Sequence, residues 1–225
     1  VAGAVPGVTP RALSDLAGRV LETHGARAVP GDEPNDAGEK FGFAACVCVN
    51  DAAANAVPKS VPLAPGDLVT IDVALAWPAT RESGGTAAVV DGATTCIVPG
   101  GQPLDAINLR DAARAATNAC ILAAQPGVSP AAIREVARAV ASRFGVVLAA
   151  IPLVHRVQQG QGPMHIALAD HMPLQPGDVI AIEPLMLQSE HAQPLVLDPG
   201  GFTLRTRDGT LGAYEECTMV VGDDE

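Results

Sequence analysis

The sequence predicts an α+β fold made of two similar halves, because one phrase occurs in it twice. Residues 62–72 and 173–183 both read Pro-Leu-x-Pro-Gly-Asp, then an apolar stretch, then one carboxylate. Proline and glycine favour a turn and the apolar stretch favours a strand, so each copy carries an acid, Asp72 or Glu183, out along a strand. The two acids are 111 residues apart (183 − 72). Helices and strands otherwise follow one another in runs, which is typical of the α+β class.

A second repeated phrase supports the same division. Pro-Gly-Val, a hydroxyl residue and proline occur at residues 6–10 and again at 126–130, and each copy opens a helical pattern. A hydroxyl at the N-cap with proline at the first helical position is a favoured helix start. No low-complexity linker separates the halves. We therefore expect residues 1–225 to form a single domain with pseudo-repeat halves at about 1–110 and 111–225.

The first half reads as a helix followed by strands. Apolar residues recur at three- and four-residue spacing after Thr9, which predicts a helix that Gly25 ends. Turn formers and charges predict a loop at 29–40, and residues 43–49 read as a buried strand. Two further strands, joined through a Ser-Gly-Gly turn, are expected at 67–77 and 86–90.

The second half begins with two helices, expected at residues 109–124 and 129–144. An apolar strand at 146–154, a Gly/Gln-rich loop at 158–163 and a strand at 179–187 should follow. The last three segments, expected to form a meander of strands, are 195–197, 202–205 and 214–221.

Composition and charge exclude several kinds of partner. The chain has 225 residues, a net charge of −11 and a pI near 4.8, which argues against nucleic acid or an anionic membrane as partner. No apolar run reaches the roughly 18–20 residues of a membrane span. Five cysteines without a Cys-x-x-Cys pair indicate reduced thiols in a cytoplasmic protein. The oligomeric state stays open.

Four segments of the chain resemble the methionine aminopeptidase family, whose pita-bread fold is shared with creatinase and prolidase. In chain order they are CVCVND (46–51), PGDLVTIDV (65–73), PGDVIAIEP (176–184) and RDGTLGAYEECT (207–218). The resemblance runs through nearly the whole chain, and several distinct segments in the right order make it specific. It implies two pseudo-symmetric halves with an antiparallel sheet covered by helices.

The resemblance implies a metal site of which this sequence keeps a part. In that family two divalent metals share two aspartates, one histidine and two glutamates, and they bind a peptide carbonyl and activate a bridging water. Three ligands carry over as Asp72, Glu183 and Glu216. The second aspartate is expected eleven residues after the first, where this chain has Ser83. Glu82 is displaced by one residue, and Asp91 lies past the expected strand.

The histidines that the resemblance implies are replaced or displaced. The histidine ligand falls on Gln161 in a Gly-Gln-Gly phrase, and glutamine is a poor ligand for transition metals. His155 is the other stand-in for it. His165 matches a second family histidine that binds the substrate or the transition state. A third, at the place that the metal-free creatinase branch uses as acid/base, is Asn55 in this chain.

The predicted function follows from acids that are kept while metal ligands are replaced. We expect a divergent, metal-independent enzyme that acts on a small polar, amino-acid-derived or peptide-like substrate by acid/base chemistry, with hydrolysis, elimination and isomerisation left open. His165 would transfer the proton, while Glu183 and Glu216 would hold an ammonium group or a shared proton beside Asp72. No cofactor is expected, and one weakly bound divalent metal at these three acids is left open.

The sequence also predicts residues that contact the substrate, and it leaves two alternative functions open. The expected substrate-binding residues are Asn55, Gln161, His155, Phe43, Met164 and Tyr214, with Phe202 beside them. One alternative is a non-catalytic pita-bread binding module, which the loss of two histidines and an aspartate would produce. The other is a metalloaminopeptidase whose site is rebuilt with His155 or His165.

Overall fold

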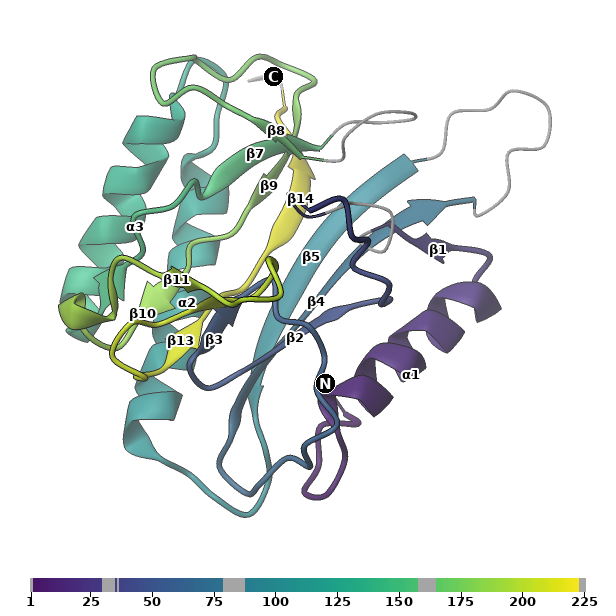
Figure 1. Cartoon of the computed structure of the whole chain (residues 1–225). Helices are drawn as coiled ribbons and strands as arrows, with labels where there is room; N and C mark the ends of the chain where they lie inside the picture. The colour runs from purple at the N-terminus through teal and green to yellow at the C-terminus, as the bar shows by residue number, and fades with distance from the viewer. Residues whose placement is uncertain (1, 30–34, 36, 79–87, 158–164, 223–225) are drawn as a thin grey trace.

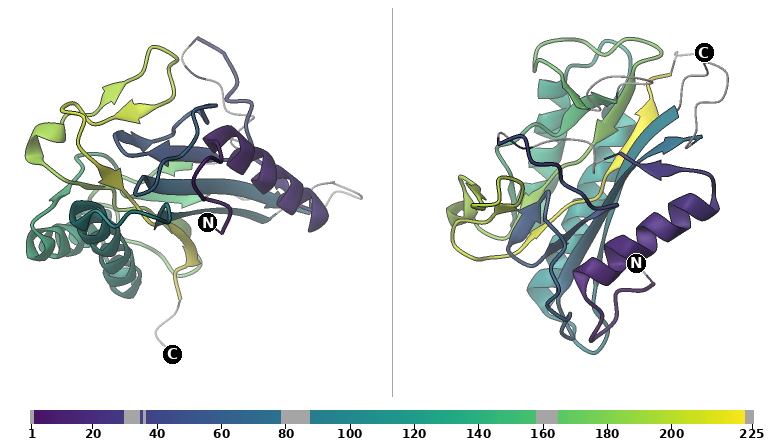
Figure 2. Two further views of the ribbon diagram at one scale, coloured as in Figure 1. Left: turned by 90° about the horizontal axis from the view of Figure 1, so that it is seen from below. Right: turned by 45° about the vertical axis from the view of Figure 1, so that its right-hand side comes forward.

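The structure, a computed structural model, describes residues 2–29, 35, 37–78, 88–157 and 165–222. Figure 1 shows antiparallel strands with one helix at one end of the molecule and two helices packed together at the other. The single helix is α1 (Pro10–Thr23), and the paired helices are α2 (Leu104–Ala123) and α3 (Pro130–Phe144). The views in Figure 2 show the same separation from below and from the side.

The helix starts that the repeated phrase predicts are confirmed. The Thr9 hydroxyl accepts a hydrogen bond from the backbone of the first turn of α1, and the Ser129 hydroxyl does the same for α3. Gly145 ends α3 in the left-handed conformation, at φ 66°, where glycine carries no steric penalty. Helix α2 begins at Leu104, five residues earlier than the predicted start at Leu109.

A sheet in the first half is built around the long strand β4 (Leu68–Trp77). On one side β4 pairs with β5 (Ala88–Ile97), and on the other it pairs with β2 (Cys46–Val49) and β1 (Arg27–Ala28), always antiparallel. The prediction of a strand ending at residue 90 was wrong. Strand β5 continues because it forms a continuous ladder with all ten residues of β4.

The second half contains a four-stranded sheet in the order β14 (Cys217–Val220), β9 (Val179–Ile182), β7 (Val154–Val157) and β8 (His165–Ala167). The single strand predicted at 146–154 was wrong, because the chain forms β6 (Val147–Leu148) and then, separately, β7.

Two short sheets complete the strand pairing. The strand predicted at 179–187 is split into β9 and β10 (Met186–Leu187), because Pro184 between them has no N–H to donate to a ladder. Strand β10 pairs with β6 and β13 (Gly212–Ala213), and β12 (Leu204–Arg205) pairs with β11 (Val196–Leu197) and β3 (Ala52–Ala54). The predicted C-terminal meander was therefore wrong, since β14 pairs with β9 instead. A short 3-10 helix, η3, spans Glu190–Ala192.

The two large sheets meet where β5 runs beside the chain entering β14 (Figure 1). The Ala93 N–H donates to the Glu216 carbonyl at 3.3 Å, and the Glu216 N–H donates back to the Ala93 carbonyl at 3.0 Å. One step along, the Thr218 hydroxyl accepts from the Asp91 N–H and donates to the Asp91 carbonyl. The acids of the two halves are brought together along this junction.

The two copies of the repeated turn are built alike. The Asp67 carboxylate accepts from the Ala64 N–H at 2.8 Å, and the Asp178 carboxylate accepts from the Gln175 N–H at 2.9 Å. The glycine before each aspartate has a positive φ. This agreement supports a pseudo-symmetric pair of halves, while the division near residue 110 stays a prediction.

The core is aliphatic and lies mainly between the paired helices and the strands of the second half. Leu109 of α2, Ile133 of α3 and Ile180 of β9 are among its fully buried side chains. Within the described part of the chain, no helix combines the length and apolarity that a membrane span requires.

Candidate metal-binding site

Asp72 and Asp91 lie on the same face of the first sheet. Asp91 is paired with Ala74 across the β4–β5 ladder, and Ala74 follows Asp72 by two residues. Side chains two residues apart in a strand point to the same side, so the two carboxylates are diagonal neighbours. Asp91 is 4% exposed. The expectation that Asp91 lies past the strand was wrong, because β5 carries it inward beside Asp72.

His155 of β7 lies against both glutamates. Its Nε2 is 3.3 Å from Oε1 of Glu183 and 3.4 Å from Oε1 of Glu216. Burial alone would lower the pKa of His155, but the hydrogen bond and the negative charge of Glu183, with the charge of Asp91, outweigh burial and raise that pKa above its ordinary value.

The two glutamates adjoin at the end of the β9–β14 ladder. Ile182 is paired with Cys217, so Glu183 leaves β9 beside the point where Glu216 enters β14. The Glu183 N–H donates to the Leu153 carbonyl at 2.9 Å, which fixes its backbone next to β7. The Glu183 side chain is 27% exposed and that of Glu216 is 2% exposed. Glu183 is therefore the more accessible of the two.

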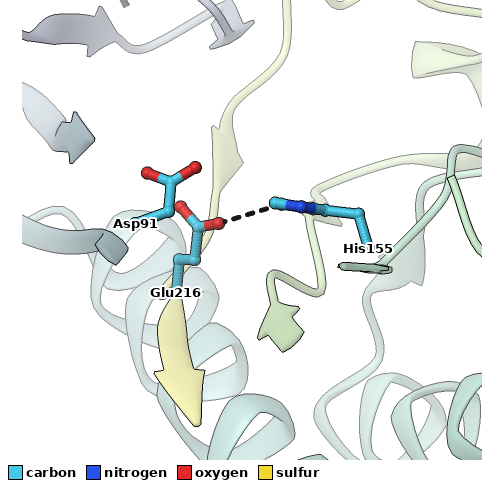
Figure 3. Close-up of side chains that lie close together, drawn as sticks. All are labelled: Asp91, His155 and Glu216. Atoms are coloured by element: carbon cyan, nitrogen blue, oxygen red, sulfur yellow. Dashed lines mark hydrogen bonds and ion pairs between the residues drawn. The ribbon is translucent and has the colours of Figure 1, made fainter. Parts of the chain in front are cut away.

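Three of these side chains form a compact, buried cluster. One donor atom from each of Asp91, His155 and Glu216 lies within 4.8 Å of the other two. Figure 3 shows Asp91 and His155 on either side of Glu216. Two buried carboxylates so close to an imidazole favour a shared cation, since unpaired buried charge is costly. Carboxylate oxygens with one imidazole nitrogen suit divalent transition metals, so the donor set fits such an ion.

Tyr214 contacts the remaining acid of the site. Its hydroxyl donates to Oδ2 of Asp72 at 2.7 Å. Burial, followed by the negative charge of Asp72, raises the pKa of Tyr214 well above its ordinary value, so the hydroxyl keeps its proton. The side chain is 1% exposed, which makes this contact with Asp72 its clearest role in the structure.

The other residues expected from the sequence lie elsewhere or outside the described residues. Asn55 is exposed, follows β3 and has a φ of 52°. His165 lies in β8, where its backbone is paired with Val157 of β7. Ser83, Gln161 and Met164 lie outside the described residues.

Phe43 belongs to a group of aromatic rings. Its ring and that of Phe202 each lie 5.4 Å from the ring of Phe41, in edge-to-face arrangements. The Arg11 guanidinium lies over the Phe43 ring, 4.4 Å from its centroid.

Sequence reasoning missed Asp91, although the chain carries a signal for it. Gly92, directly after it, is a glycine inside a strand, which often marks a close approach of another backbone. A Cβ on Gly92 would come within 3.5 Å of the Glu216 carbonyl oxygen. Gly92 therefore marks the strand junction that brings Asp91 to Glu216.

Comparison with known proteins shows the family to which the chain belongs. The model of metallopeptidase family M24 matches residues 1–222. The chain belongs to this family. It is 28% identical over 225 residues to a methionine aminopeptidase of Staphylococcus epidermidis, covering 97% of this chain and 84% of that protein.

Solved structures of similar proteins confirm the pita-bread fold. The methionine aminopeptidase of Rickettsia prowazekii superposes with a TM-score of 0.80 at 22% identity, covering 97% of this chain and 84% of that one. A prolidase from Pyrococcus furiosus gives a TM-score of 0.63 at 20% identity, covering 99% of this chain and 55% of that one. The fold class predicted from the sequence, and the resemblance to methionine aminopeptidases, are therefore confirmed.

Proposed function

We propose that this M24 protein is a metal-dependent aminopeptidase that removes the N-terminal residue of a peptide. The observation that carries the proposal is the cluster of Asp91, His155 and Glu216, whose donor atoms lie within 4.8 Å of one another in a buried site. Membership of a metallopeptidase family and likeness to proteins named methionine aminopeptidase support a peptide with N-terminal methionine as the first substrate to test.

The residues that would hold the metal are two aspartates, one histidine and two glutamates: Asp72, Asp91, His155, Glu183 and Glu216. These are the ligand types that the resemblance to methionine aminopeptidases implies, with Asp91 in the role first sought at Ser83 and His155 in the role first sought at Gln161. A divalent ion bound there would act as a Lewis acid on a peptide carbonyl and lower the pKa of a bound water.

Glu183 is our candidate for proton transfer. It is the more exposed of the two glutamates, so water and substrate reach its carboxylate more readily than that of Glu216. Its carboxylate would accept a proton from the attacking water and pass it to the amine that leaves. His155, whose Nε2 lies 3.3 Å from Oε1 of Glu183, would bind the ion beside that carboxylate.

The other residues predicted to contact substrate enter the proposal as recognition groups. Phe43, whose ring packs against that of Phe41, offers an apolar surface for the side chain of the N-terminal residue. Asn55 would contact the peptide backbone, and the proton-transfer role of His165 stays a prediction. Asn55 can orient a substrate by hydrogen bonding, but an amide has no useful pKa for proton transfer. Gln161 and Met164 stay predictions.

The metal-independent enzyme expected from the sequence is the second candidate. The contacts of His155 favour it, because an imidazole that lies against both Glu183 and Glu216 can carry a proton without a metal. A reducing, cytoplasmic location is also proposed, and the five free cysteines support it.

Metal analysis with an activity assay tests both candidates. Purified protein would be stripped with a chelator, assayed on a Met-Ala-Ser tripeptide and an Xaa-Pro dipeptide, and assayed again after addition of Mn²⁺, Co²⁺ or Zn²⁺. We expect cleavage of the tripeptide only with metal, and loss of cleavage in the Glu183→Gln variant. Activity in the stripped protein that metal does not raise would favour the second candidate. Neither activity nor metal binding would favour a binding module.

A further inference from the structure

Tyr214 links the C-terminal part of the site to its N-terminal part. It lies two residues before Glu216, in the segment that leads into β14, and its hydroxyl donates to Oδ2 of Asp72 on β4 at 2.7 Å. It is the single tyrosine of the chain and is 1% exposed. One short segment therefore supplies a candidate ligand and, two residues earlier, a hydrogen bond to another.

The tyrosine is fixed at its backbone and at its ring. The Thr95 hydroxyl donates to the Tyr214 carbonyl at 2.5 Å, and Thr95 is in turn 2.7 Å from the Thr70 hydroxyl of β4. The ring belongs to a buried cluster that includes Cys48, whose Sγ lies 3.9 Å from the tyrosine hydroxyl. Because both ends are held, the position of the hydroxyl is set before any ligand arrives.

We propose that Tyr214 is a positioning residue that orients the Asp72 carboxylate for metal binding. A hydrogen bond to Oδ2 restricts rotation of the carboxylate, so it also sets the direction in which Oδ1 points. Hydrogen bonds behind a metal ligand fix its orientation and tune its affinity. This inference rests on the proposed metal-dependent function and adds to it a residue that does not itself touch the metal.

The Tyr214→Phe variant removes the hydroxyl and keeps the ring. We would titrate Co²⁺ into the chelator-stripped full chain by calorimetry and record the visible absorption spectrum of the cobalt protein. We expect Co²⁺ affinity about 10- to 100-fold lower than in the unmutated protein, together with a changed cobalt spectrum. Equal affinity and an unchanged spectrum would overturn the role of Tyr214. A failure of the unmutated protein to bind any metal would instead overturn the proposed function.

Cys48→Ala is the matched control, because it alters the packing beside the same hydroxyl without removing the hydrogen bond to Asp72. We expect its Co²⁺ affinity to stay within about twofold of that of the unmutated protein, because a residue that does not act on the metal ligands should change binding no more than independent sites usually do. A loss as large as that of Tyr214→Phe would mean that general packing around the ring, and not the hydrogen bond, controls metal affinity.

A double-mutant cycle tests whether Tyr214 acts through Asp72. In an Asp72→Asn background, Tyr214→Phe should lower Co²⁺ affinity by much less than it does alone, because coupled residues are not additive. Full additivity would contradict the proposal.

If Tyr214→Phe does not fold, the unmutated sequence still provides a test. With 3-fluorotyrosine incorporated, the whole ¹⁹F signal of the chain comes from Tyr214, because the chain has one tyrosine. That signal should shift when Zn²⁺ binds, and shift less in Asp72→Asn. No shift despite binding measured by calorimetry would overturn the role of Tyr214.

Discussion

His155 and Glu216 face each other inside the protein, with Nε2 and Oε1 3.4 Å apart and side chains that are 7% and 2% exposed. They come from β7 and from the entry into β14, which are separated in the sheet by β9. With Asp91 they form a site of three buried donor atoms. Because the residues of this site are known, the role of each acid can be tested by substitution.

Asp91→Asn and Ser83→Ala together test which position supplies the second aspartate. Asp91→Asn keeps the shape of the side chain and removes its charge. We expect it to abolish metal retention and to lower kcat/KM by more than about 100-fold, since even residues behind metal ligands commonly cost 10- to 100-fold. Ser83→Ala should leave both unchanged. Metal content by elemental analysis and initial rates on the tripeptide decide which of the two positions binds the metal. Normal metal content in Asp91→Asn would contradict the assignment of Asp91 as a ligand.

Metal binding should stabilise the folded protein. An ion that binds only the folded state adds about 2.7 kcal/mol to the free energy of unfolding at a concentration of 100 times its Kd. For a chain of this size that predicts a Tm roughly 5–10 °C higher than that of the stripped protein. Differential scanning calorimetry with and without Mn²⁺ measures the shift. The Glu216→Gln variant should show little of it, and an equal shift in that variant would locate the ion elsewhere.

Thr218→Val should destabilise the junction between the sheets. The Thr218 hydroxyl accepts from the Asp91 N–H at 2.8 Å and donates to the Asp91 carbonyl at 2.7 Å, and valine has the same shape without either bond. Leaving backbone groups unsatisfied costs about 1–3 kcal/mol. We expect the free energy of unfolding, measured by urea denaturation, to fall by an amount in that range. The control is Thr23→Val, whose hydroxyl bonds an exposed helix carbonyl, and it should change stability by less than about 0.5 kcal/mol.

The buried cysteines should be unreactive in the folded protein. Burial raises the pKa of Cys48 and of Cys120 to about 12, so at pH 8 only about one thiol in ten thousand at each position is ionised. With a disulfide reagent at pH 8 we expect Cys217, which is exposed, to react first, and all five thiols to react after unfolding. Fast labelling of Cys48 or Cys120 in the folded protein, located by peptide mass mapping, would be inconsistent with this burial.

The same thiols predict a loss of stability in alkali. Their pKa is higher in the folded state than in the unfolded state, so the protonated form favours folding. Stability should be unaffected below about pH 9 and should fall as the pH rises from there toward 12. Urea midpoints measured across this pH range and compared with those of Cys120→Ala give the contribution of that thiol to stability. A urea midpoint that increases as the pH is raised from 9 would contradict the prediction.

Local chemistry made much of the fold predictable. Threonine or serine followed by proline located the starts of α1 and α3, because capping and the fixed φ of proline act within one turn. The doubled Pro-Gly-Asp phrase located β4 and β9 and the acids Asp72 and Glu183. Strand lengths were harder to predict, because a strand ends where its neighbour stops pairing with it, as β5 does beside β4.

The composition of the site was only partly predictable, and Asp91 explains why. Spacing from Asp72 led to Ser83, whereas the register of the β4–β5 ladder, which spacing along the chain does not determine, places Asp91 beside Asp72. His155 was retained as a stand-in for a ligand but was assigned to substrate binding. Its distances of 3.3 Å and 3.4 Å to the two glutamates depend on the pairing between β7, β9 and β14. Spacing along the sequence does not predict that pairing.

By itself, the sequence determined the α+β class, the repeated turns, the helix starts and three of the acids, since each depends on residues close together in the chain. Tertiary structure decided which aspartate joins those acids, that His155 lies between the two glutamates, and that Tyr214 contacts Asp72. These relations are set by strand register across the junction of β5 and β14, where residues more than a hundred positions apart are held by backbone hydrogen bonds.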